Sequence, residues 1–382
     1  MIKRNILECM TLVGKAPSHY EGAKTYVSTG AVDCDHIDYK QTEQVTYDNR
    51  PSRANLSVTS GDILFAKMCG TKKTLRINDV MAKYLFSTGF CAVRANESVM
   101  IADLLYHLLS SEQFLTQKDQ NSSGATQKAI TNTGLKKITI QVPDLEEQRV
   151  LAAKLDCIEQ MMARRRIQIE YFDQLVKSRF IEMFGDPVEN PHGFRKVALS
   201  ELAEIKIGPF GSLLHKEDYI EGGHPLLNPS HIVDGKVVPD CKLTISDKKY
   251  DELKAYHLHI GDVVMGRRGE MGRCAVVPSE GFLCGTGSLL IRTKGEVTAD
   301  YIQKIISFPS FRKTIEDMAV GQTMPNLNVP IVSKFQIIKP PIEVQKNYYK
   351  FVAQTDKSKL AIQKSLDKLE ILKKALMQKY FG

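Results

Sequence analysis

The sequence predicts an α+β fold, in which two similar mixed α/β domains are joined by two long antiparallel helices that form a coiled coil. Two observations lead to this prediction. The chain of 382 residues repeats itself at a nearly constant spacing, and each repeat ends in a long stretch without proline or glycine. A chain of this length usually forms more than one hydrophobic core. A module that is used twice also implies internal pseudo-two-fold symmetry.

The internal repeat is clearest between residues 123–149 and 320–346. At a constant offset of 197 residues, a glycine, a proline and two polar residues recur. The matched pairs are Gly124 and Gly321, Pro143 and Pro340, Glu146 and Glu343, and Gln148 and Gln345. Upstream the offset becomes 200, which places "SGDILFAK" (60–67) over "IGDVVMGR" (260–267). One module of about 190 residues is therefore used twice.

Each module begins with a part that mixes strands and helices. The segments "DILFAK" (62–67) and "DVVMGR" (262–267) begin in Gly-Asp turns and predict strands. Residues 100–114 and 298–311 have the spacing of short amphipathic helices. We therefore expect a first globular domain at residues 1–143 and a second at residues 185–340.

Long helices are predicted for residues 144–184 and 341–382. No proline or glycine occurs between Pro143 and Gly185, or between Pro341 and Gly382. A helix of about 40 residues is about 60 Å long. Mostly apolar residues follow a heptad register from Leu151, and the same register recurs from Tyr348.

The two long helices are expected to pair, because their lengths, registers and starting points match. The second helix leaves the second domain, so pairing with the first helix requires it to run in the opposite direction. The alternative is that the two helices are unrelated and that each lies on the surface of its own domain.

Composition and charge are compatible with a polyanionic partner but do not require one. The net charge is +8 and the pI is about 8.9, and many basic proteins simply have a solvated positive surface. The eight cysteines are scattered and none forms a CxxC pair. This favours free thiols in a reducing cytoplasm. We find neither an apolar run long enough for a membrane span nor a leader peptide.

Five segments, in their order along the chain, resemble one protein family. They are "VPDLEEQRVLAAKLDCIEQM" (142–161), "FIEMFGDPVENPHGF" (180–194), "GPFGSLL" (208–214), "SKFQIIKPPIEVQ" (333–345) and "LDKLEILKKALMQKYFG" (366–382). Each is a weak signal by itself, but the combination is specific. Over essentially its whole length, the chain resembles the specificity (S) subunit of type I restriction-modification systems.

The resemblance implies two target recognition domains, each of which reads one half of a bipartite site in double-stranded DNA. The long helices would set the distance between the half-sites and dock two copies of the modification subunit. S-adenosylmethionine would belong to that subunit, and ATP to a restriction subunit that joins later. The chain itself would catalyse nothing and would hold no cofactor or metal. One departure is that the first half lacks a counterpart of "GPFGSLLHKEDYIE" (208–221).

Candidate DNA-binding residues are of two kinds. Basic residues follow the repeated strands, since arginine and lysine bind phosphates and arginine also recognises guanine. Amides in "GQTMPNLN" (321–328) and in the matching segment of the first half can hydrogen-bond to adenine edges. In the second half they are Arg267, Arg268, Arg273, Gln322 and Asn326. In the first half they are Lys67, Lys72, Lys73, Arg76 and Gln127. The alternatives are an exposed basic hairpin without a partner, and amides that cap a turn.

Apolar residues that lie partly off the heptad seam are candidates for contact with a partner helix. They are Leu175, Phe180 and Phe184, and Leu376, which lies on the seam of the second helix, is a further candidate. In a pair of helices these side chains would be exposed unless another helix covered them, and exposed apolar patches usually mark interfaces.

Motifs for catalysis are nearly absent. The sequence "NPSH" (228–231) comes close to the Asn-Pro-Pro-aromatic loop of amino-methyltransferases, but it lacks the second proline and the aromatic ring that stacks on a flipped adenine. No phosphate-binding loop of the form GxxxxGK[ST] occurs. Two other classes stay open: a stand-alone nuclease or methyltransferase with degenerate motifs, and a protein-interaction scaffold. The S chain of a phase-variable or type IIG-like methylation system is a further alternative.

Overall fold

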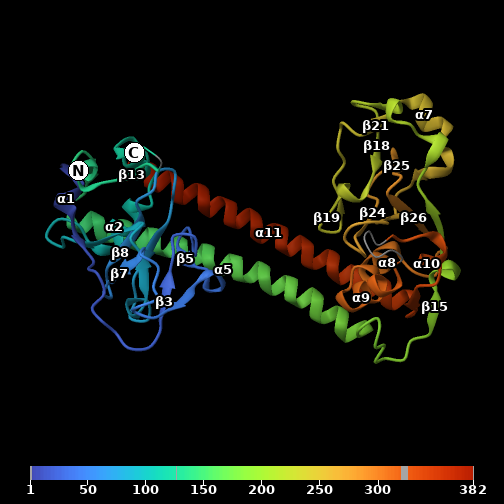
Figure 1. Cartoon of the computed structure of the whole chain (residues 1–382), viewed down its shortest axis with the longest axis horizontal. Coiled ribbons are helices and arrows are strands. Elements are labelled where there is room, and N and C mark those ends of the chain that lie inside the picture. Colours follow the sequence, from blue (N-terminus) through green and yellow to red (C-terminus); the bar gives the residue numbers. More distant parts are fainter. Residues whose placement is uncertain (1, 126, 320–325, 382) are drawn as a thin grey trace. The chain divides into compact units, whose positions relative to one another are not determined.

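The computed structural model describes residues 2–125, 127–319 and 326–381. The chain divides into two compact units, and each long helix contributes residues to both of them. Unit 1 comprises Met1–Ile169 and Ala361–Gly382, and unit 2 comprises Glu170–Leu360. Figure 1 shows the elements of both units along the chain.

Unit 1 contains two four-stranded sheets. The first has the order β2-β11-β8-β9, and all its strands are antiparallel. The second has the order β6-β3-β10-β7. The strands of the first sheet are β2 (Met10–Val13), β11 (Phe90–Ala95), β8 (Ile63–Ala66) and β9 (Thr74–Arg76). Those of the second are β6 (Glu43–Val45), β3 (Lys24–Val27), β10 (Leu85–Ser87) and β7 (Ala54–Leu56).

Unit 2 repeats this arrangement with one added strand. Its four-stranded sheet has the order β16-β26-β23-β24, and its other sheet has the order β17-β21-β18-β25-β22. The first sheet consists of β16 (Ala203–Ile207), β26 (Ser288–Thr293), β23 (Val263–Gly266) and β24 (Cys274–Val276). The second consists of β17 (Tyr219–Ile220), β21 (Thr244–Ile245), β18 (His224–Leu227), β25 (Phe282–Cys284) and β22 (His257–Leu258). The extra strand β17 comes from the segment that has no counterpart in the first half.

Smaller elements also recur. A hairpin of β4 (Val32–Asp33) and β5 (His36–Ile37) matches one of β19 (Ile232–Val233) and β20 (Lys236–Val237). The pair β1 (Ile2–Asn5) and β14 (Thr139–Val142) matches the pair β15 (Lys196–Ala198) and β27 (Gln336–Ile338). The same order of elements in both units confirms the internal repeat.

Each of the two predicted short helices is a pair of helices. In unit 1 the helix α2 (Ala102–Leu109) is followed by α3 (Glu112–Gln120), and in unit 2 the helix α8 (Ala299–Ile306) is followed by α9 (Pro309–Met318). The break has a local cause in both. Ser111 caps α3 by accepting a hydrogen bond from the Phe114 amide at 3.1 Å. Pro309 lacks an amide hydrogen and therefore suits the first turn of α9.

Buried polar contacts repeat as well. The Gln148 side chain accepts a hydrogen bond from the Ile101 amide at 2.9 Å, and Gln345 accepts one from the Thr298 amide at 3.0 Å. Both glutamines are fully buried. Their amide groups join the start of each long helix to the loop before α2 or α8. The two modules therefore share side-chain contacts in addition to their order of strands.

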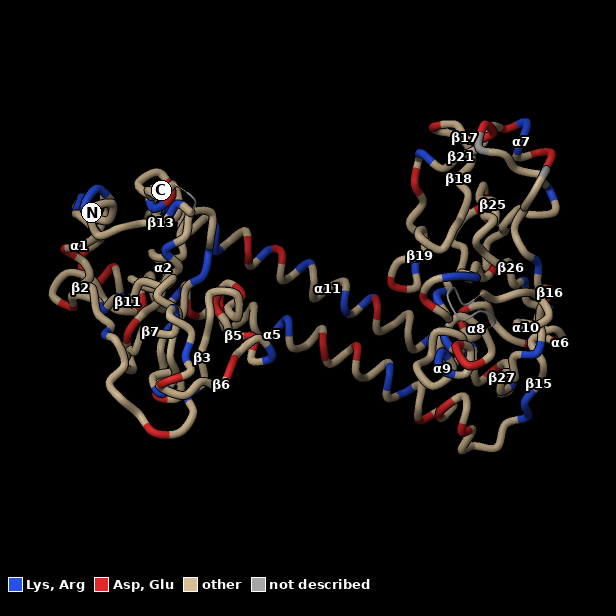
Figure 2. Tube along the Cα trace, in the orientation of Figure 1, with Lys and Arg blue, Asp and Glu red and all other residues tan. Residues whose placement is uncertain are grey.

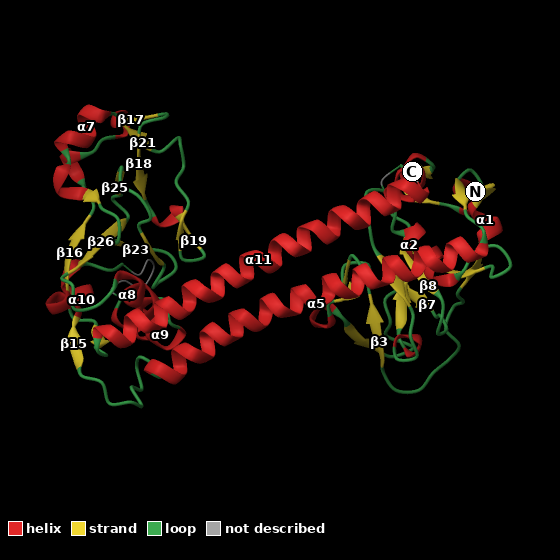
Figure 3. Cartoon of the chain, turned by 180° about the vertical axis from the view of Figure 1, so that it is seen from behind, coloured by secondary structure: helices red, strands yellow, loops and turns green. Residues whose placement is uncertain are grey.

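The predicted long helices are α5 (Leu145–Phe184) and α11 (Ile342–Phe381), each of 40 residues. Figure 3 shows both as unbroken helices. Every position of the predicted heptad seam is buried or half-buried. In unit 1, Ile158 and Met162 pack against Leu366. The ion pair of Glu159 with Lys373 lies further toward the start of α5 and the end of α11 than the pair of Arg166 with Glu370. The helices are therefore antiparallel.

The same direction holds in unit 2, where the Lys359 ammonium group bonds to Asp173 and the Tyr348 hydroxyl donates to the Val176 carbonyl oxygen at 3.2 Å. The ends of the helices enter the hydrophobic cores: Phe180 and Phe184 lie in the core of unit 2, and Phe381 lies in that of unit 1. No helix in the described part of the chain is both long and apolar enough to cross a membrane.

Candidate nucleic-acid interface

The predicted DNA-binding residues lie mainly at one end of the four-stranded sheet in each unit, which we name the loop end. In unit 1 it comprises the residues that follow β2 and β8 and those that precede β11. In unit 2 it comprises the residues that follow β16 and β23 and those that precede β26. Because neighbouring strands are antiparallel, these loops all lie at the same end of the sheet.

Lys67 and Arg267 occupy equivalent positions at the two loop ends. The Lys67 amide donates to the Gly89 carbonyl oxygen, and the Arg267 amide donates to that of Gly287, both at 2.9 Å. Their own carbonyl oxygens accept hydrogen bonds from the amides of Ile130 and Leu327, again at 2.9 Å in both units. The backbone hydrogen bonds therefore place Lys67 and Arg267 at equivalent positions in the two units.

The same hydrogen bonds bring a second predicted segment to each loop end. Gln127 precedes Ile130 by three residues and is exposed, and Asn326 directly precedes Leu327 and is half-buried. Lys67 and Gln127, and likewise Arg267 and Asn326, therefore belong to segments that are hydrogen-bonded to each other at the loop end. Gln322 lies outside the described residues.

Arg267 and Arg268 differ in their surroundings. Arg267 Nε donates to the Leu327 carbonyl oxygen at 3.0 Å, and Nη1 donates to that of Thr286 at 3.4 Å. Partial burial, together with the neighbouring charge of Arg268, lowers the pKa of Arg267. The Arg268 side chain is exposed, and within the described ranges no hydrogen bond or ion pair engages its guanidinium group. Arg268 is therefore the arginine that is available to a ligand.

Arg273 has partners within unit 2. Its Nε and Nη2 atoms donate to Glu270 Oε2 at 3.1 and 2.7 Å, and Nη1 donates to the Pro229 carbonyl oxygen at 3.3 Å. Glu270 also accepts a hydrogen bond from Arg312 at 2.7 Å, and these two arginines lower its pKa. Arg273 therefore supports the loop that follows β23, and less of its guanidinium group is free for DNA than the sequence predicts.

The basic residues of unit 1 separate in the same way. Lys67 is half-buried and Lys72 is exposed. The Lys73 ammonium group donates to the Thr29 carbonyl oxygen at 2.7 Å, which ties the loop to the strand region around β3. Lys67 and Lys72 therefore remain the better candidates for phosphate contacts in this unit.

Arg76, which was predicted to bind DNA, lies at the opposite end of the sheet from the loop end. Its guanidinium group pairs with Asp103 of α2 at 2.7 Å and with Asp156 of α5 at 2.5 Å. It also lies 4.2 Å from the centre of the Tyr106 ring. Its charge therefore joins β9 to two helices inside unit 1. No local pattern in the sequence indicates this contact, because Asp156 is 80 residues away.

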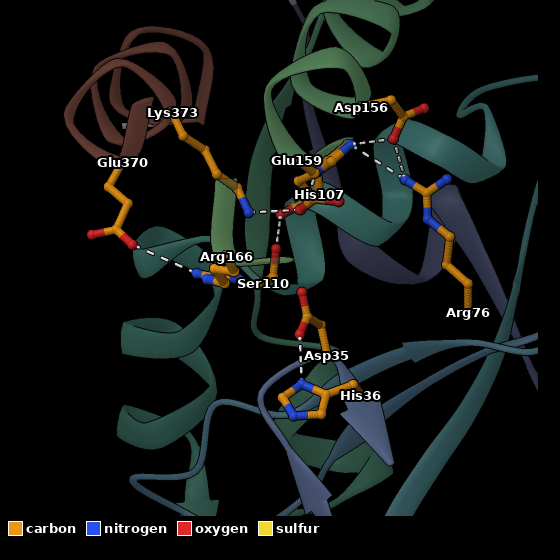
Figure 4. Close-up of polar contacts among 10 residues, drawn as sticks. All are labelled: Asp35, His36, Arg76, His107, Ser110, Asp156, Glu159, Arg166, Glu370 and Lys373. Carbon is orange, nitrogen blue, oxygen red and sulfur yellow. Dashed lines mark hydrogen bonds and ion pairs between the residues drawn. The ribbon is translucent and has the colours of Figure 1, made fainter. Parts of the chain in front are cut away.

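Arg76 belongs to an ion network that the sequence did not reveal, shown in Figure 4. The buried His107 ring contacts Asp156 at 2.8 Å through Nε2, and its Nδ1 lies 3.5 Å from Glu159. Lys373 of α11 bonds to Glu159 at 2.6 Å. Burial by itself would raise the pKa of Glu159, but His107 and Lys373 outweigh burial and lower it to about 2.

The side chains of His107, Asp156 and Glu159 are close enough to share a metal ion, with ligand atoms within 4.8 Å of one another. The arrangement of charges argues against this use. Arg76 and Lys373 already bond to the two carboxylates, and a divalent cation beside them would be repelled by both positive groups. We therefore interpret the cluster as an ion network that fastens α5 and α11 to the rest of unit 1.

Figure 2 shows basic and acidic residues interspersed along α5 and α11. The predicted partner-helix residues differ in their exposure. Leu175 is 47% exposed, whereas Phe180 and Phe184 are fully buried. Phe184 packs edge-on against Tyr301 of α8 and Tyr348 of α11, with ring centres 5.2 and 5.4 Å apart. The expected exposure of the two phenylalanines is therefore wrong. Leu376 is half-buried against the core of unit 1.

The segment Asn228–His231 has a structural role. Asn228 Oδ1 accepts a hydrogen bond from the Gly287 amide at 3.3 Å at the loop end of unit 2. The His231 ring is buried and contacts the Leu226 carbonyl oxygen at 2.7 Å. The ring therefore fills the turn after β18, and no aromatic or imidazole ring of this segment is presented to a flipped base.

Comparisons with known proteins agree with this geometry. The EcoKI specificity subunit of the type I restriction enzyme of Escherichia coli K12 is 22% identical over 317 residues, which is 76% of this chain and 67% of that protein. One solved structure has a TM-score of 0.66 and 22% identity. It concerns the structural basis of complex assembly and conformational transition of the type I R-M system. It covers 99% of this chain and 97% of its own.

The HsdS subunit from Thermoanaerobacter tengcongensis has a TM-score of 0.50 and 22% identity over 100% of this chain and 96% of its own. The two structural similarities establish the fold. The family model for the type I restriction modification DNA specificity domain matches this chain twice, at residues 21–171 and 191–372. These matches take in most of the sequence and one copy of the repeat each, and the chain belongs to the type I restriction modification DNA specificity domain family.

Proposed function

We propose that this chain is the DNA-recognition subunit of a type I restriction-modification complex, in which each unit reads one half of a bipartite site. The chain serves as the specificity component and leaves catalysis to other subunits. S-adenosylmethionine then belongs to the modification subunits and ATP to a restriction subunit.

The observation that carries this proposal is the loop end, which is built alike in both units but has different side chains. Lys67 and Arg267 sit on the same hydrogen-bonded backbone, with Gln127 in the neighbouring segment of one unit and Asn326 in that of the other. Phosphate contacts fix a protein on the duplex, whereas arginine and amide contacts to base edges select a sequence. A repeated frame with different side chains suits a protein that reads two different half-sites.

Modification subunits have a candidate docking surface on α5. Tyr171 and Leu175 lie four residues apart, hence on the same face of the helix, and they are 64% and 47% exposed. Exposed apolar residues at helical spacing are typical of a surface that another helix covers. We propose that this face binds a modification subunit, and that two such subunits join one chain because the module is repeated.

The long helices are proposed to set the number of base pairs between the half-sites. Proteins with two similar reading heads commonly contact DNA at positions about one helical turn apart, or roughly 10 base pairs. We therefore propose an asymmetric, bipartite target with half-site centres at about this separation.

A binding and methylation assay tests the proposal. The chain purified alone should bind duplex DNA with an affinity that falls steeply between low and moderate salt, because phosphate contacts release counterions. It should transfer no methyl group from S-adenosylmethionine until a modification subunit is added. Methylation by the chain alone would support the rival assignment of a methyltransferase, and failure to bind duplex DNA would favour a protein-interaction scaffold.

A further inference from the structure

The insertion that distinguishes unit 2 from unit 1 places an aromatic ring at the loop end. Phe210 is 62% exposed and lies in the segment that directly follows β16. The stretch after β2 in unit 1, "GKAP" (14–17), contains no aromatic residue. An exposed phenylalanine offers neither charge nor a hydrogen bond, so at the end of a sheet it is suited to contact with an apolar surface of a ligand.

The stem of this loop is held firmly. The Gly208 amide donates to the Ser288 carbonyl oxygen at 3.1 Å, and the Pro209 carbonyl oxygen accepts a hydrogen bond from the Thr286 hydroxyl at 2.8 Å. The backbones of Gly208 and Gly285 also approach so closely that a Cβ on Gly208 would collide with the Gly285 carbonyl group. Phe210 therefore projects from a fixed support.

The same contacts relate Phe210 to Arg268. Thr286 bonds to Pro209 on one side and accepts a hydrogen bond from Arg267 on the other. Phe210 directly follows Pro209, and Arg268 directly follows Arg267. In the sheet, β16 and β23 are separated by β26 alone. The exposed residues Phe210 and Arg268 therefore lie on either side of Thr286 at the loop end of unit 2.

Strand spacing gives the separation of the two strands that lead to these groups. Neighbouring strands lie about 4.8 Å apart, so the ends of β16 and β23, which lead to Phe210 and Arg268, are about 10 Å apart. Along a duplex this separation corresponds to about three base-pair steps of 3.4 Å.

We propose that Phe210 is a specificity-determining residue, which contacts the C5-methyl group of a thymine in the half-site read by unit 2. The methyl group is an apolar feature that a base presents in the major groove, and phenylalanine is one of the side chains that recognise it. The contacted thymine is expected about three base pairs from the base that Arg268 contacts, because the two strands that lead to these residues are separated by one strand. This inference rests on the proposed function.

The test uses the complex of the full chain with its modification subunit, after its methylation motif has been mapped. In synthetic duplexes that carry the motif, each thymine of the unit 2 half-site is replaced in turn by uracil, which lacks only the methyl group. The wild-type complex should lose about four-fold in affinity at one of these positions, the value expected for one methyl-sized apolar contact. The Phe210→Ala complex should bind the thymine and uracil duplexes equally.

Two matched controls accompany the test. Ile220→Ala removes another exposed apolar side chain of the same insertion, in β17 of the other sheet, and should keep the response to uracil. Thermal unfolding of Phe210→Ala should match that of the wild type, since the ring is mostly exposed.

The proposal is overturned if no thymine of that half-site responds to uracil, or if Phe210→Ala keeps the full response. It is also overturned if Phe210→Ala only weakens assembly with the modification subunit, because Phe210 would then contact protein. A wild-type complex that methylates no bipartite motif would instead contradict the proposed function, so the two failures are distinguishable.

Discussion

At the loop end of unit 2, two adjacent arginines have separate roles. Arg267 donates to two backbone carbonyl oxygens, so it supports the loop, whereas Arg268 is exposed. Substitution of either residue by alanine is expected to weaken DNA binding at the same half-site, but for different reasons.

Arg268→Ala should cost about 1–3 kcal/mol of DNA-binding free energy at the unit 2 half-site, the range for one arginine contact to a base. Its unfolding temperature should stay that of the wild type. Arg267→Ala should also lower the free energy of unfolding by about 1 kcal/mol, because the part-buried Leu327 carbonyl group loses its donor. Gel-shift titration and thermal unfolding measure the two quantities. Equal stability of the two variants would contradict the distinction.

The ion network of unit 1 makes stability depend on pH. The pKa of Glu159 is lowered from 4.5 to about 2 in the folded chain, so the ionised group stabilises the fold above the unfolded value. That stabilisation is lost as the pH falls from about 4.5 toward 2. Urea unfolding of the wild type at pH 6 and pH 3.5 should show a larger decrease than that of Glu159→Gln. An identical decrease in both proteins would show that Glu159 is not stabilised by His107 and Lys373.

At the scale of elements, the long helices could be predicted from the sequence because their limits are local. Proline precedes each helix, glycine follows each, and the heptad register identifies the face that becomes buried. The burial of Phe180 and Phe184 could not be predicted in this way. The rings that pack against them belong to Tyr301, Tyr348 and Phe308. These residues lie more than 100 positions away in the sequence, and no periodic pattern links them to α5.

The same limit applies to the candidate site. The position of Lys67 and Arg267 after a strand was readable, since a Gly-Asp turn and an apolar run mark β8 and β23. The sequence could not predict which arginine has no partner among the described residues of its unit. The partners of Arg76, Arg267 and Arg273 belong largely to other elements. Residue type therefore predicts which end of the sheet carries the basic residues. Which of those residues are exposed depends on contacts with other elements.

The end of α5 tests the division between core and surface. Phe184→Ala should lower the free energy of unfolding by about 3–5 kcal/mol, the range for removing a buried phenylalanine. Leu175→Ala, nine residues earlier and 47% exposed, should leave stability nearly unchanged and weaken assembly with the modification subunit. Denaturant unfolding and size-exclusion chromatography of the mixed subunits provide the measurements. Normal assembly of Leu175→Ala would remove this face of α5 from the proposed interface.

At the scale of the whole molecule, the repeat explains how one chain can read a target with two parts. The backbone contacts of Gln148 and Gln345, and of Lys67 and Arg267, repeat closely. The exposed side chains at the loop ends differ, and so does the insertion after β16. Because the two units share a backbone arrangement but differ in side chains at their loop ends, we expect two unlike half-sites. The target should therefore be asymmetric.

The most direct measurement is the DNA methylation pattern produced when this chain is expressed with its modification subunit. Mapping of methylated adenines should yield a single motif of two unlike half-sites, separated by unspecified bases. Arg268→Ala should relax the half-site read by unit 2 and leave the other one unchanged. A contiguous motif, or a motif that stays the same in Arg268→Ala, would contradict the assignment of one half-site to each unit.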